Sequence, residues 1–574
     1  MEMRRACKMP PLLPPKLRKE TCDSDKKGVK DVLDISMRIQ IVAPEKLSSK
    51  FYYLQLFESQ DNSDGPWNLI TESEQLDSYE TYELEEIFAI EYCFERLQWI
   101  RIDVLEKTDV GNTVNCSAVF NVAHAAINNY DLTLRDHMGS SIAEIEIWSQ
   151  IRERPQPILI QVEAKNISSK LISSNSNIAI EVYKYEELSR KKLLYRSEGL
   201  RQPKLTWRSF NIQSDDLYGD EKSIEIVCIS DDEKEGIVGH AVITQDNAKA
   251  NEPIPIYSEN FKQGRKPIGE FRVVKFSQLR AFSFLEYIRT GTTLRFAFAI
   301  DFSAREHLMT RDDHFQFAND VEFVVRSIGE TVEPFNASNS FLSYGFGAKI
   351  PPQSRESNNF CLSLDVDPTT QGVNGVLNAF MKCYQRVLPL STAKFSQIIY
   401  HMAKTAQTNY NKDASCSYFV LFIITRGAVD DLKETVQAAI YSSKVPISIV
   451  FIGVGVDGLD EVDRIGSAGK RLEYQGRKSE RDNLQYVNAT KTRLECDNYS
   501  EMVSTFLYKT LQNITWQLPA FFMQNHVTPG RSVEGRRPSA SLSRDSSNTD
   551  PLDSPPSEEH LERHRTISGD VSSR

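Results

Sequence analysis

Residues 293–305, TLRFAFAIDFSAR, combine an apolar run with polar residues that follow it immediately. Residues 418–427, YFVLFIITRG, repeat this form later in the chain. Continuous apolar runs are typical of strands buried on both faces of a parallel sheet, and such sheets bind ligands beyond the carboxyl ends of their strands. The two stretches therefore predict an α/β domain with a functional edge around Asp301 and Arg426.

The same edge has part of the chemistry of a magnesium site. Mg²⁺ prefers oxygen ligands in near-octahedral order, and an aspartate followed at alternate positions by hydroxyls can supply several of them from one loop. Asp301 and Ser303 fit this pattern, whereas Arg305 and Arg426 do not. We therefore expect the remnant of a metal site that holds neither magnesium nor manganese.

The residues around these two strands favour a sheet that is covered on both faces. Helical stripes of apolar residues span 373–388 and 430–443, and further candidates for buried strands span 341–346 and 447–454. Strands interleaved with amphipathic helices are typical of a doubly wound, mostly parallel sheet.

The first half of the chain has a different pattern. Apolar and polar residues alternate from Met37, in two successive blocks of short strands separated by turn-rich loops. Such blocks predict two tandem all-β sandwiches. The predicted organisation is a flexible leader at 1–34, all-β domains at 35–152 and 153–275, the α/β domain at 285–518, and a disordered tail rich in Ser, Pro and Arg at 524–574.

Composition limits the class of protein. The chain has 574 residues, of which 40% are hydrophobic and 26% charged, and its net charge is −11. We expect no nucleic-acid partner, because phosphate contacts need a basic face. No apolar run approaches the ~20 residues that span a bilayer. Nine scattered cysteines without a Cys-x-x-Cys pair indicate reduced thiols in an intracellular protein.

Several segments resemble the copine family. Residues 344–352, YGFGAKIPP, are similar to its GFGARIPP segment, and residues 284–288, FLEYI, are similar to its FLDYI. Residues 195–198, YRSE, followed by Trp207 resemble its YRTE and NPVW pair. The resemblance covers roughly residues 35–515 and is strongest in the α/β domain. It implies two C2 domains and a von Willebrand A domain, with calcium-dependent phospholipid binding and recruitment of protein partners.

Calcium binding by C2 domains uses several aspartates from loops at one end of the sandwich. Few carboxylates stand at these positions here. The first sandwich offers Glu106 and Asp109, and the second offers Asp231 and Asp232, while Asn177 stands where the resemblance implies an aspartate. These weak candidates either form an open cation site or belong to solvated turns, so we expect calcium to bind weakly if at all.

Basic residues in the second sandwich offer a calcium-independent route to an anionic membrane. Each lysine or arginine near an anionic leaflet contributes about 1 kcal/mol. The alternative is an ordinary solvated loop. The candidates for lipid binding are Arg190, Lys191, Lys192, Arg201 and Lys204.

The resemblance also implies how the α/β domain departs from its family. Members hold a divalent ion through Asp-x-Ser/Thr-x-Ser, a threonine from a second loop, and the aspartate of a Thr-Asp-Gly turn. Here Thr392 lies beside the threonine position, and Arg305 and Arg426 replace the last serine and the aspartate. Guanidinium groups keep their charge and repel cations.

We hypothesise that Arg305 or Arg426 pairs with Asp301 in place of the metal; the alternative is that both arginines point to solvent. The predicted partner-binding residues at this edge are Asp301, Arg305, Gly347, Thr392 and Arg426.

Catalytic motifs are scarce. Residues 453–458, GVGVDG, match the Gly-x-Gly-x-x-Gly pattern of dinucleotide-binding loops, with Glu473 about twenty residues further on. The chain has no Walker loop, Gly-x-Ser-x-Gly or His-Glu-x-x-His motif. We expect no enzyme, and a nucleotide-binding enzyme is the remote alternative.

The tail carries hydroxyls that follow arginines. Ser539, Thr566 and Ser568 are therefore predicted phosphorylation sites, and each phosphate would add about −1.5 to −2 charges. The alternative is a spacer whose arginines only keep it soluble.

The function that we predict is a non-enzymatic adaptor in membrane trafficking or signalling. It would be cytoplasmic, and peripheral at the cytoplasmic face of the plasma membrane or another membrane. It would bind anionic phospholipid and recruit protein partners through the α/β domain. The alternative is a scaffold, independent of calcium and metal, that has lost lipid binding.

Overall fold

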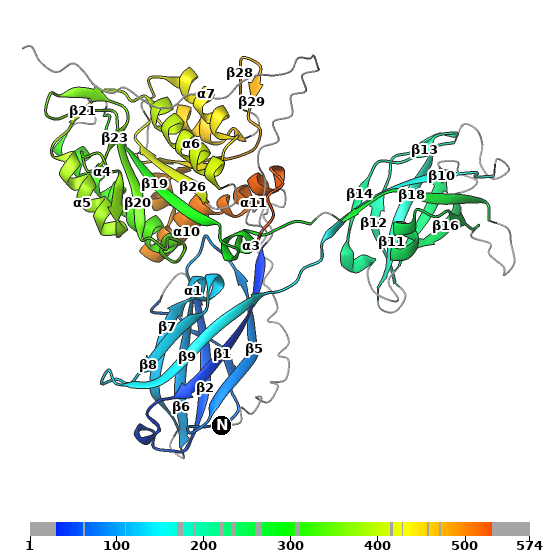
Figure 1. Cartoon of the computed structure of the whole chain (residues 1–574), viewed down its shortest axis with the longest axis horizontal. Coiled ribbons are helices and arrows are strands. Elements are labelled where there is room, and N and C mark those ends of the chain that lie inside the picture. Colours follow the sequence, from blue (N-terminus) through cyan, green and yellow to red (C-terminus); the bar gives the residue numbers. More distant parts are fainter. Residues whose placement is uncertain are drawn as a thin grey trace, which may run out of the picture. The chain divides into compact units, whose positions relative to one another are not determined.

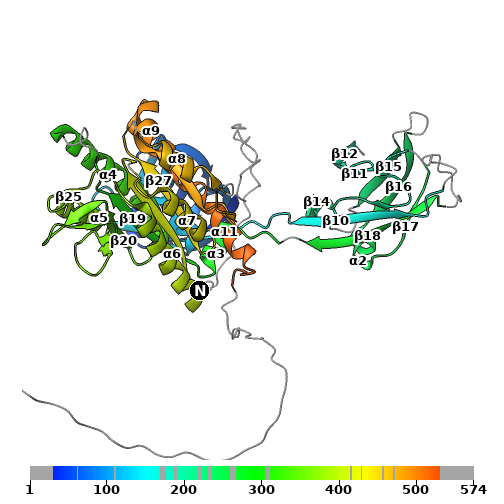
Figure 2. The ribbon, with the colours of Figure 1, turned by 90° about the horizontal axis from the view of Figure 1, so that it is seen from above.

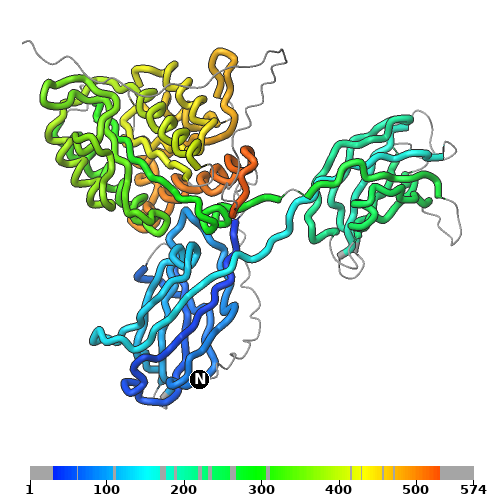
Figure 3. Tube along the Cα trace, in the orientation of Figure 1, coloured from blue at the N-terminus to red at the C-terminus, as the bar shows by residue number. Residues whose placement is uncertain are grey.

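The computed structural model describes most of the chain between residues 30 and 530. The predicted sites Asp109, Asp231, Asp232, Arg305, Ser539, Thr566 and Ser568 lie outside the described residues, as does the side chain of Arg190. Figure 3 shows that each of the three folded regions is built from one continuous stretch of chain. The described ranges are 30–60, 63–108, 111–168, 176–186, 190–217, 223–230, 236–258, 267–278, 280–304, 310–413, 417–427, 429–455, 458–469 and 472–530.

The first folded region is an antiparallel sandwich (Figure 1). Its two halves, in the orders β3-β2-β6-β7 and β8-β9-β1-β5, are joined by the single residue pair Ser117 and Arg135. Alternation in β1 buries Leu33, Ile35 and Met37. The elements are β1 (Asp31–Ile41), β2 (Phe51–Gln60), β3 (Asn68–Glu72), β4 (Leu76–Asp77), β5 (Thr81–Tyr92), β6 (Gln98–Thr108), β7 (Gly111–Asn121), α1 (Val122–Ile127), β8 (Tyr130–Arg135) and β9 (Ser141–Ile151).

The second folded region is a sandwich of two separate sheets, in the orders β13-β10-β18-β17 and β12-β11-β15-β16. Trp207 is completely buried in its core and donates from its indole N–H to the carbonyl oxygen of Ile178 at 3.2 Å. The elements are β10 (Pro157–Lys165), β11 (Ile178–Glu186), β12 (Arg190–Arg196), β13 (Leu205–Thr206), β14 (Phe210–Gln213), β15 (Ile224–Ser230), β16 (Ile237–Ile243), α2 (Gln245–Ala250), β17 (Ile254–Ile256) and β18 (Gly269–Gln278).

The third folded region is an α/β domain with one main sheet in the order β23-β20-β19-β26-β27-β30. The five strands from β20 to β30 in this order run parallel. The strands are β19 (Thr293–Asp301), β20 (Ser340–Phe346), β21 (Ala348–Ile350), β22 (Arg355–Ser357), β23 (Phe360–Cys361), β24 (Thr369–Gln371), β25 (Leu388–Pro389), β26 (Ser417–Thr425), β27 (Ile447–Gly453), β28 (Glu473–Tyr474), β29 (Arg477–Lys478) and β30 (Leu484–Asn488).

Helices cover both faces of this sheet (Figure 1 and Figure 2). Phe298 and Ile300 pack with α4, α5, α10 and α11, whereas Ala297 and Ala299 pack with α6, α7 and α8. The helices are α3 (Phe284–Arg289), α4 (Arg311–Val332), α5 (Gly372–Tyr384), α6 (Phe395–Lys412), α7 (Leu432–Ser442), α8 (Asp460–Gly466), α9 (Ala489–Glu495), α10 (Tyr499–Leu511) and α11 (Ile514–Gln524).

The strand order creates a switch point between β19 and β26. The chain moves outward from β19 to β20 and then returns to the other side of β19 to form β26, β27 and β30. Crevices at such points lie beyond the carboxyl ends of the strands and are the usual ligand sites of doubly wound sheets. Asp301 and Thr425, the last residues of the two strands, stand at this point.

The observed ends of the regions differ from the predicted ones. The first sandwich begins at Asp31 rather than at residue 35, and α11 continues to Gln524, beyond residue 518. Pro519 lies inside α11, where proline normally breaks a helix. Burial of Leu518, Phe521 and Phe522 in the core stabilises the helix through this position.

Candidate functional site

Asp301 is completely buried at the end of β19. Its Oδ1 accepts a hydrogen bond from the backbone N–H of Ser303 at 2.8 Å, and its Oδ2 accepts one from the Thr425 hydroxyl at 2.7 Å. Because Thr425 ends β26, this carboxylate joins the two strands on either side of the switch point. Burial raises the pKa of Asp301 to about 6, and the hydrogen bonds from Thr425 and Ser303 and the nearby charge of Arg426 limit that rise.

Arg426 directly follows Thr425 and is only 9% exposed. Its guanidinium carbon lies 4.1 Å from the centroid of the Phe317 ring, which α4 provides. None of its three side-chain nitrogens has a hydrogen-bond partner in the described part of the chain. Burial lowers the pKa of Arg426, but arginine keeps its proton at any ordinary pH. The switch point therefore contains a fixed positive charge, stabilised by a cation–π contact of roughly 2 kcal/mol.

This arrangement differs from both predictions for Arg426. It does not point to solvent, and no ion pair joins it to Asp301 among the described residues. Both oxygens of Asp301 already accept hydrogen bonds, and the ring of Phe317 offers the guanidinium a flat surface instead. The charge of Arg426 acts on Asp301 through space.

Gly347 has a structural reason to lack a side chain. Its φ is +71°, and a Cβ there would lie 2.8 Å from Asp301 Oδ1 and 2.9 Å from the Cβ of Ala393. Ala393 is buried, whereas its neighbour Thr392 is exposed. Of the five predicted partner-binding residues, Asp301, Gly347 and Arg426 therefore lie together, and Thr392 faces outward.

The described residues of this edge, which exclude 305–309, do not fit a divalent ion. The Asp301 oxygens are engaged, and the position that would supply a second carboxylate holds the buried guanidinium of Arg426. The Ser303 hydroxyl is buried beside the carboxylate without a well-formed hydrogen bond and is one remaining oxygen ligand. One hydroxyl next to a fixed cation does not bind Mg²⁺, which needs several oxygens in octahedral order.

The first sandwich brings three loops together at one end. The pairs Gln40 with Thr81 and Ile41 with Ala143 place loops 42–50, 78–80 and 136–140 there. Glu106, a calcium candidate, is 2% exposed, and its Oε1 accepts a hydrogen bond from the backbone N–H of Ser49 at 2.6 Å. The Glu106 carboxylate therefore holds the first loop in place, and this hydrogen bond competes with calcium binding.

Exposed apolar side chains stand at this end beside the exposed charges of Glu45, Lys46 and Glu80. We call Val42, Phe51, Tyr79 and Met138, all of them exposed, the apolar tip. Tyr79 and Met138 are 68% and 79% exposed. Among the described residues, no three His, Cys, Asp or Glu side chains lie close enough to hold a metal ion.

The basic residues of the second sandwich are largely engaged with their own sheet. Lys191 Nζ lies 2.7 Å from Glu225 Oε2, and Arg201 Nε donates to Asn177 Oδ1 at 3.1 Å. Lys204 is exposed. Because Glu225 neutralises Lys191, this face carries less positive charge than its sequence indicates.

Close packing explains a glycine at the start of the glycine-rich loop after β27. A Cβ on Gly453 would lie 2.8 Å from Leu459 Cδ1. Helix α8 then begins with Asp460, Glu461 and Asp463 in its first turn. These carboxylates oppose the attraction that a helix N-terminus has for phosphate. The geometry does not favour the nucleotide-binding alternative.

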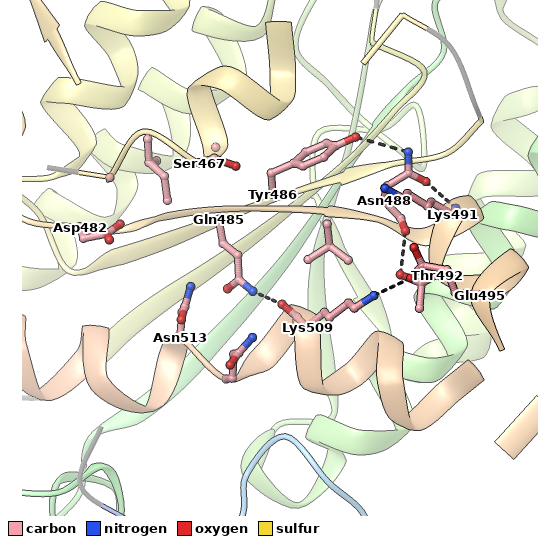
Figure 4. Close-up of a pocket in the computed structure, with 15 residues that line it drawn as sticks. Ser467, Asp482, Gln485, Tyr486, Asn488, Lys491, Thr492, Glu495, Lys509 and Asn513 are labelled. Atoms are coloured by element: carbon pink, nitrogen blue, oxygen red, sulfur yellow. Dashed lines mark hydrogen bonds and ion pairs between the residues drawn. The ribbon is translucent and has the colours of Figure 1, made fainter. Parts of the chain in front are cut away.

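A polar cavity of about 420 Å³ lies beside strand β30 (Figure 4). Its side chains bind one another: Gln485 donates to the carbonyl oxygen of Lys509, and Lys509 Nζ lies 3.0 Å from Glu495 Oε2. Asn488 Oδ1 accepts from the backbone N–H of Lys491 at 2.7 Å. Because these lining groups are paired with one another, they are not available to bind a ligand.

Sequence reasoning did not assign Phe317 and Tyr384 to the site. Phe317 supports Arg426, and the hydroxyl of Tyr384 lies 2.6 Å from His314 Nδ1 next to it. The only signal was the apolar stripe of α4, on which Phe317, Val321 and Val324 share one face. That stripe indicates a core helix and does not reveal a contact with an arginine distant in sequence.

We predict that Mg²⁺ and Mn²⁺ leave the thermal unfolding midpoint of the protein unchanged. Arg426→Asp should be destabilised in chelator and saturably stabilised by either ion, because it replaces the buried cation with a carboxylate beside Asp301. Arg464→Asp, at an exposed position of the same domain, is the control for the change in charge. Saturable stabilisation of the unmodified protein would contradict the account.

Stability should also depend on pH through Asp301. Its folded pKa of about 6 lies above its unfolded value, so the folded state binds the proton more tightly. The resulting stabilisation is complete below about pH 4 and is lost as the pH rises through 6; for a shift of about two units it amounts to roughly 3 kcal/mol. Denaturant unfolding of the protein and of Asp301→Asn between pH 4 and 7.5 measures this pH-dependent part of the free energy of unfolding. Parallel pH profiles would refute the assignment.

Gly347→Ala should destabilise the α/β domain by more than Gly291→Ala. Both glycines have positive φ, +71° and +108°, but a Cβ on Gly291 meets nothing within 4 Å. The control therefore contains the backbone strain without the clash with Asp301. Chemical denaturation of the two variants gives the comparison, and equal losses would show that Asp301 does not crowd this position.

The chain is similar in sequence to members of the copine family. The family model described as Copine matches residues 307–530. Copine family protein 5 of Caenorhabditis elegans is 26% identical over 506 residues, which cover 82% of this chain and 69% of that protein. Within the described residues, no helix is both long and apolar enough to cross a membrane.

Two solved structures show local likeness. BON1-C2B is 15% identical, with a TM-score of 0.20, over 22% of this chain and 93% of its own. The two tandem C2 domains of Extended-Synaptotagmin 2 are 10% identical, with a TM-score of 0.16, over 47% of this chain and 99% of their own. The chain is thus similar to the copine family, through the family model over residues 307–530 and through its sequence relationship to Copine family protein 5.

Proposed function

We propose that this protein is a membrane-associated adaptor that works without calcium or another divalent ion. The apolar tip of its first sandwich would enter the lipid surface, and the edge around Asp301 and Arg426 would contribute to protein recruitment. The observation that carries the proposal is the apolar tip, which stands at the loop end where the resemblance implies calcium-binding carboxylates. Similarity to the copine family supports the general role of a phospholipid-binding adaptor.

The apolar tip suits insertion into lipid. Burial of one large apolar side chain contributes about 1.5–3 kcal/mol, and Tyr79 and Met138 are the most exposed members of the tip. Lys46 in the first loop is exposed and is attracted to an anionic leaflet, but the exposed Glu45 and Glu80 at the same end oppose this attraction. The two inserted side chains would contribute roughly 3–6 kcal/mol, which corresponds to reversible membrane binding.

The same end does not depend on calcium for its shape. Glu106 holds the first loop through the N–H of Ser49, and Lys50 Nζ pairs with Asp77 Oδ2 at 2.7 Å. These contacts hold the described loops together, which is the role that a bridging cation would otherwise have. Calcium would have to displace a lysine or a backbone donor to bind here.

The α/β domain supports a non-enzymatic role. Its switch point contains a carboxylate and a guanidinium that are fixed by buried contacts. Neither group has the exposure that a general acid, base or nucleophile needs to reach a substrate. These buried groups fix the shape of the edge, and a protein partner would contact the exposed residues around them, such as Thr392.

Co-sedimentation with phosphatidylserine vesicles tests the membrane part. We expect equal retention of the protein in calcium and in chelator, because no calcium step is needed. The double variant Met138→Asp with Tyr79→Asp should lose at least roughly tenfold in affinity, since two apolar contacts are replaced by repelled charges. Leu69→Asp, an exposed apolar position on β3 away from the tip, is the matched control.

Retention that requires calcium would contradict the proposal, as would a double variant that binds like the control. Absence of retention under every condition would favour the alternative scaffold that has lost lipid binding. The pairing of Lys191 with Glu225 is the observation that favours this alternative.

A further inference from the structure

A second cavity of the α/β domain, of about 280 Å³, is walled by tyrosines. Tyr400 comes from α6, Tyr441 from α7, and Tyr474 from the hairpin of β28 and β29. The rings of Tyr400 and Tyr441 have centroids 5.8 Å apart. All three side chains are half-buried and pack against the core on one side, so the aromatic walls are fixed in place.

The hairpin places an arginine beside these rings. Gln475 and Gly476 form its two-residue turn with φ values of +50° and +75°, the pattern of a type I′ turn. This turn sets Tyr474 directly opposite Arg477, and both line the cavity. The charge of Arg477 lowers the pKa of Tyr400, although burial raises it more, so the two groups are close.

Several donors here have no protein acceptor. In the described part of the chain, neither the hydroxyls of Tyr400, Tyr441 and Tyr474 nor the guanidinium of Arg477 is hydrogen-bonded. Lys444 and Lys478 at the rim pair with Glu480 and Glu473 at 3.3 and 3.1 Å. Arg477 therefore leaves the rim with one uncompensated positive charge.

Aromatic walls with available hydroxyls are the features that bind polyproline II segments. In that conformation the backbone makes no internal hydrogen bonds, its carbonyls are free to accept from tyrosine hydroxyls, and the proline rings stack on aromatic faces. The small volume suits a short segment rather than a folded domain. The unpaired Arg477 selects for a carboxylate next to the prolines.

We propose that this tyrosine cavity binds a short proline-rich segment with an adjacent acidic residue, supplied by a protein partner. The inference names the partner chemistry of the adaptor role and rests on that role. It adds a second recruitment site on the face of α6 and α7, besides the edge at Asp301 and formed by other residues than the apolar tip.

Fluorescence anisotropy with a labelled synthetic peptide of consecutive prolines flanked by aspartates tests this proposal on the full chain. We expect saturable binding that weakens roughly tenfold in Arg477→Glu, from loss of the charge pair. Tyr474→Phe, which keeps the ring and removes one hydroxyl, should weaken it roughly fivefold. Arg311→Glu and Tyr499→Phe, at exposed positions of the same domain outside the cavity, are matched controls and should bind normally.

Lack of binding, or equal binding by the cavity variants and their controls, would overturn the proposal. Equal binding of a peptide flanked by lysines would overturn it as well. If Arg477→Glu instead released the protein from phosphatidylserine vesicles, the cavity would face lipid and the peptide site would be wrong. Vesicle binding by the apolar tip is measured without peptide, so the two proposals fail independently. Thermal unfolding of each variant confirms that it is folded.

Discussion

The buried carboxylate of Asp301 determines the character of the α/β domain. It accepts hydrogen bonds from the N–H of Ser303 and the hydroxyl of Thr425 and so ties β19 to β26 at the switch point. Gly347 has no side chain because a Cβ would collide with this carboxylate. Arg426 brings the compensating charge, held over the ring of Phe317 rather than in direct contact. Among the described groups of this edge, Asp301 is the carboxylate, and its charge is compensated by Arg426.

Local pattern was sufficient for much of the fold. The apolar runs at 293–300 and 418–424 predicted β19 and β26, because strands buried on both faces cannot alternate. The helical stripes at 373–388 and 430–443 correspond to α5 and α7. The α/β domain was predicted to end at residue 518, whereas α11 continues to Gln524, because the burial of Phe521 and Phe522, a tertiary effect, maintains the helix beyond Pro519.

The side-chain geometry of the site was harder to predict from the sequence than the fold. Sequence placed Asp301, Gly347 and Arg426 at one edge, since each follows a parallel strand, but it could not show where the guanidinium points. Its partner Phe317 lies on a helix whose apolar stripe is typical of any core helix. The same limit applies to Lys191 of β12, whose charge is neutralised by Glu225 of β15, with β11 between these strands. Contacts between residues distant in sequence decide which charges are available.

We propose that fixed charge and apolar surface replace coordinated ions in both places where the resemblance to the copine family implies them. The measurement that tests this most directly is electron paramagnetic resonance of Mn²⁺ titrated with the metal-free protein. The account predicts that the signal of hydrated Mn²⁺ stays undiminished in the presence of an excess of protein. Loss of that signal at one equivalent, reversed by Mg²⁺, would show an intact divalent site and contradict the account.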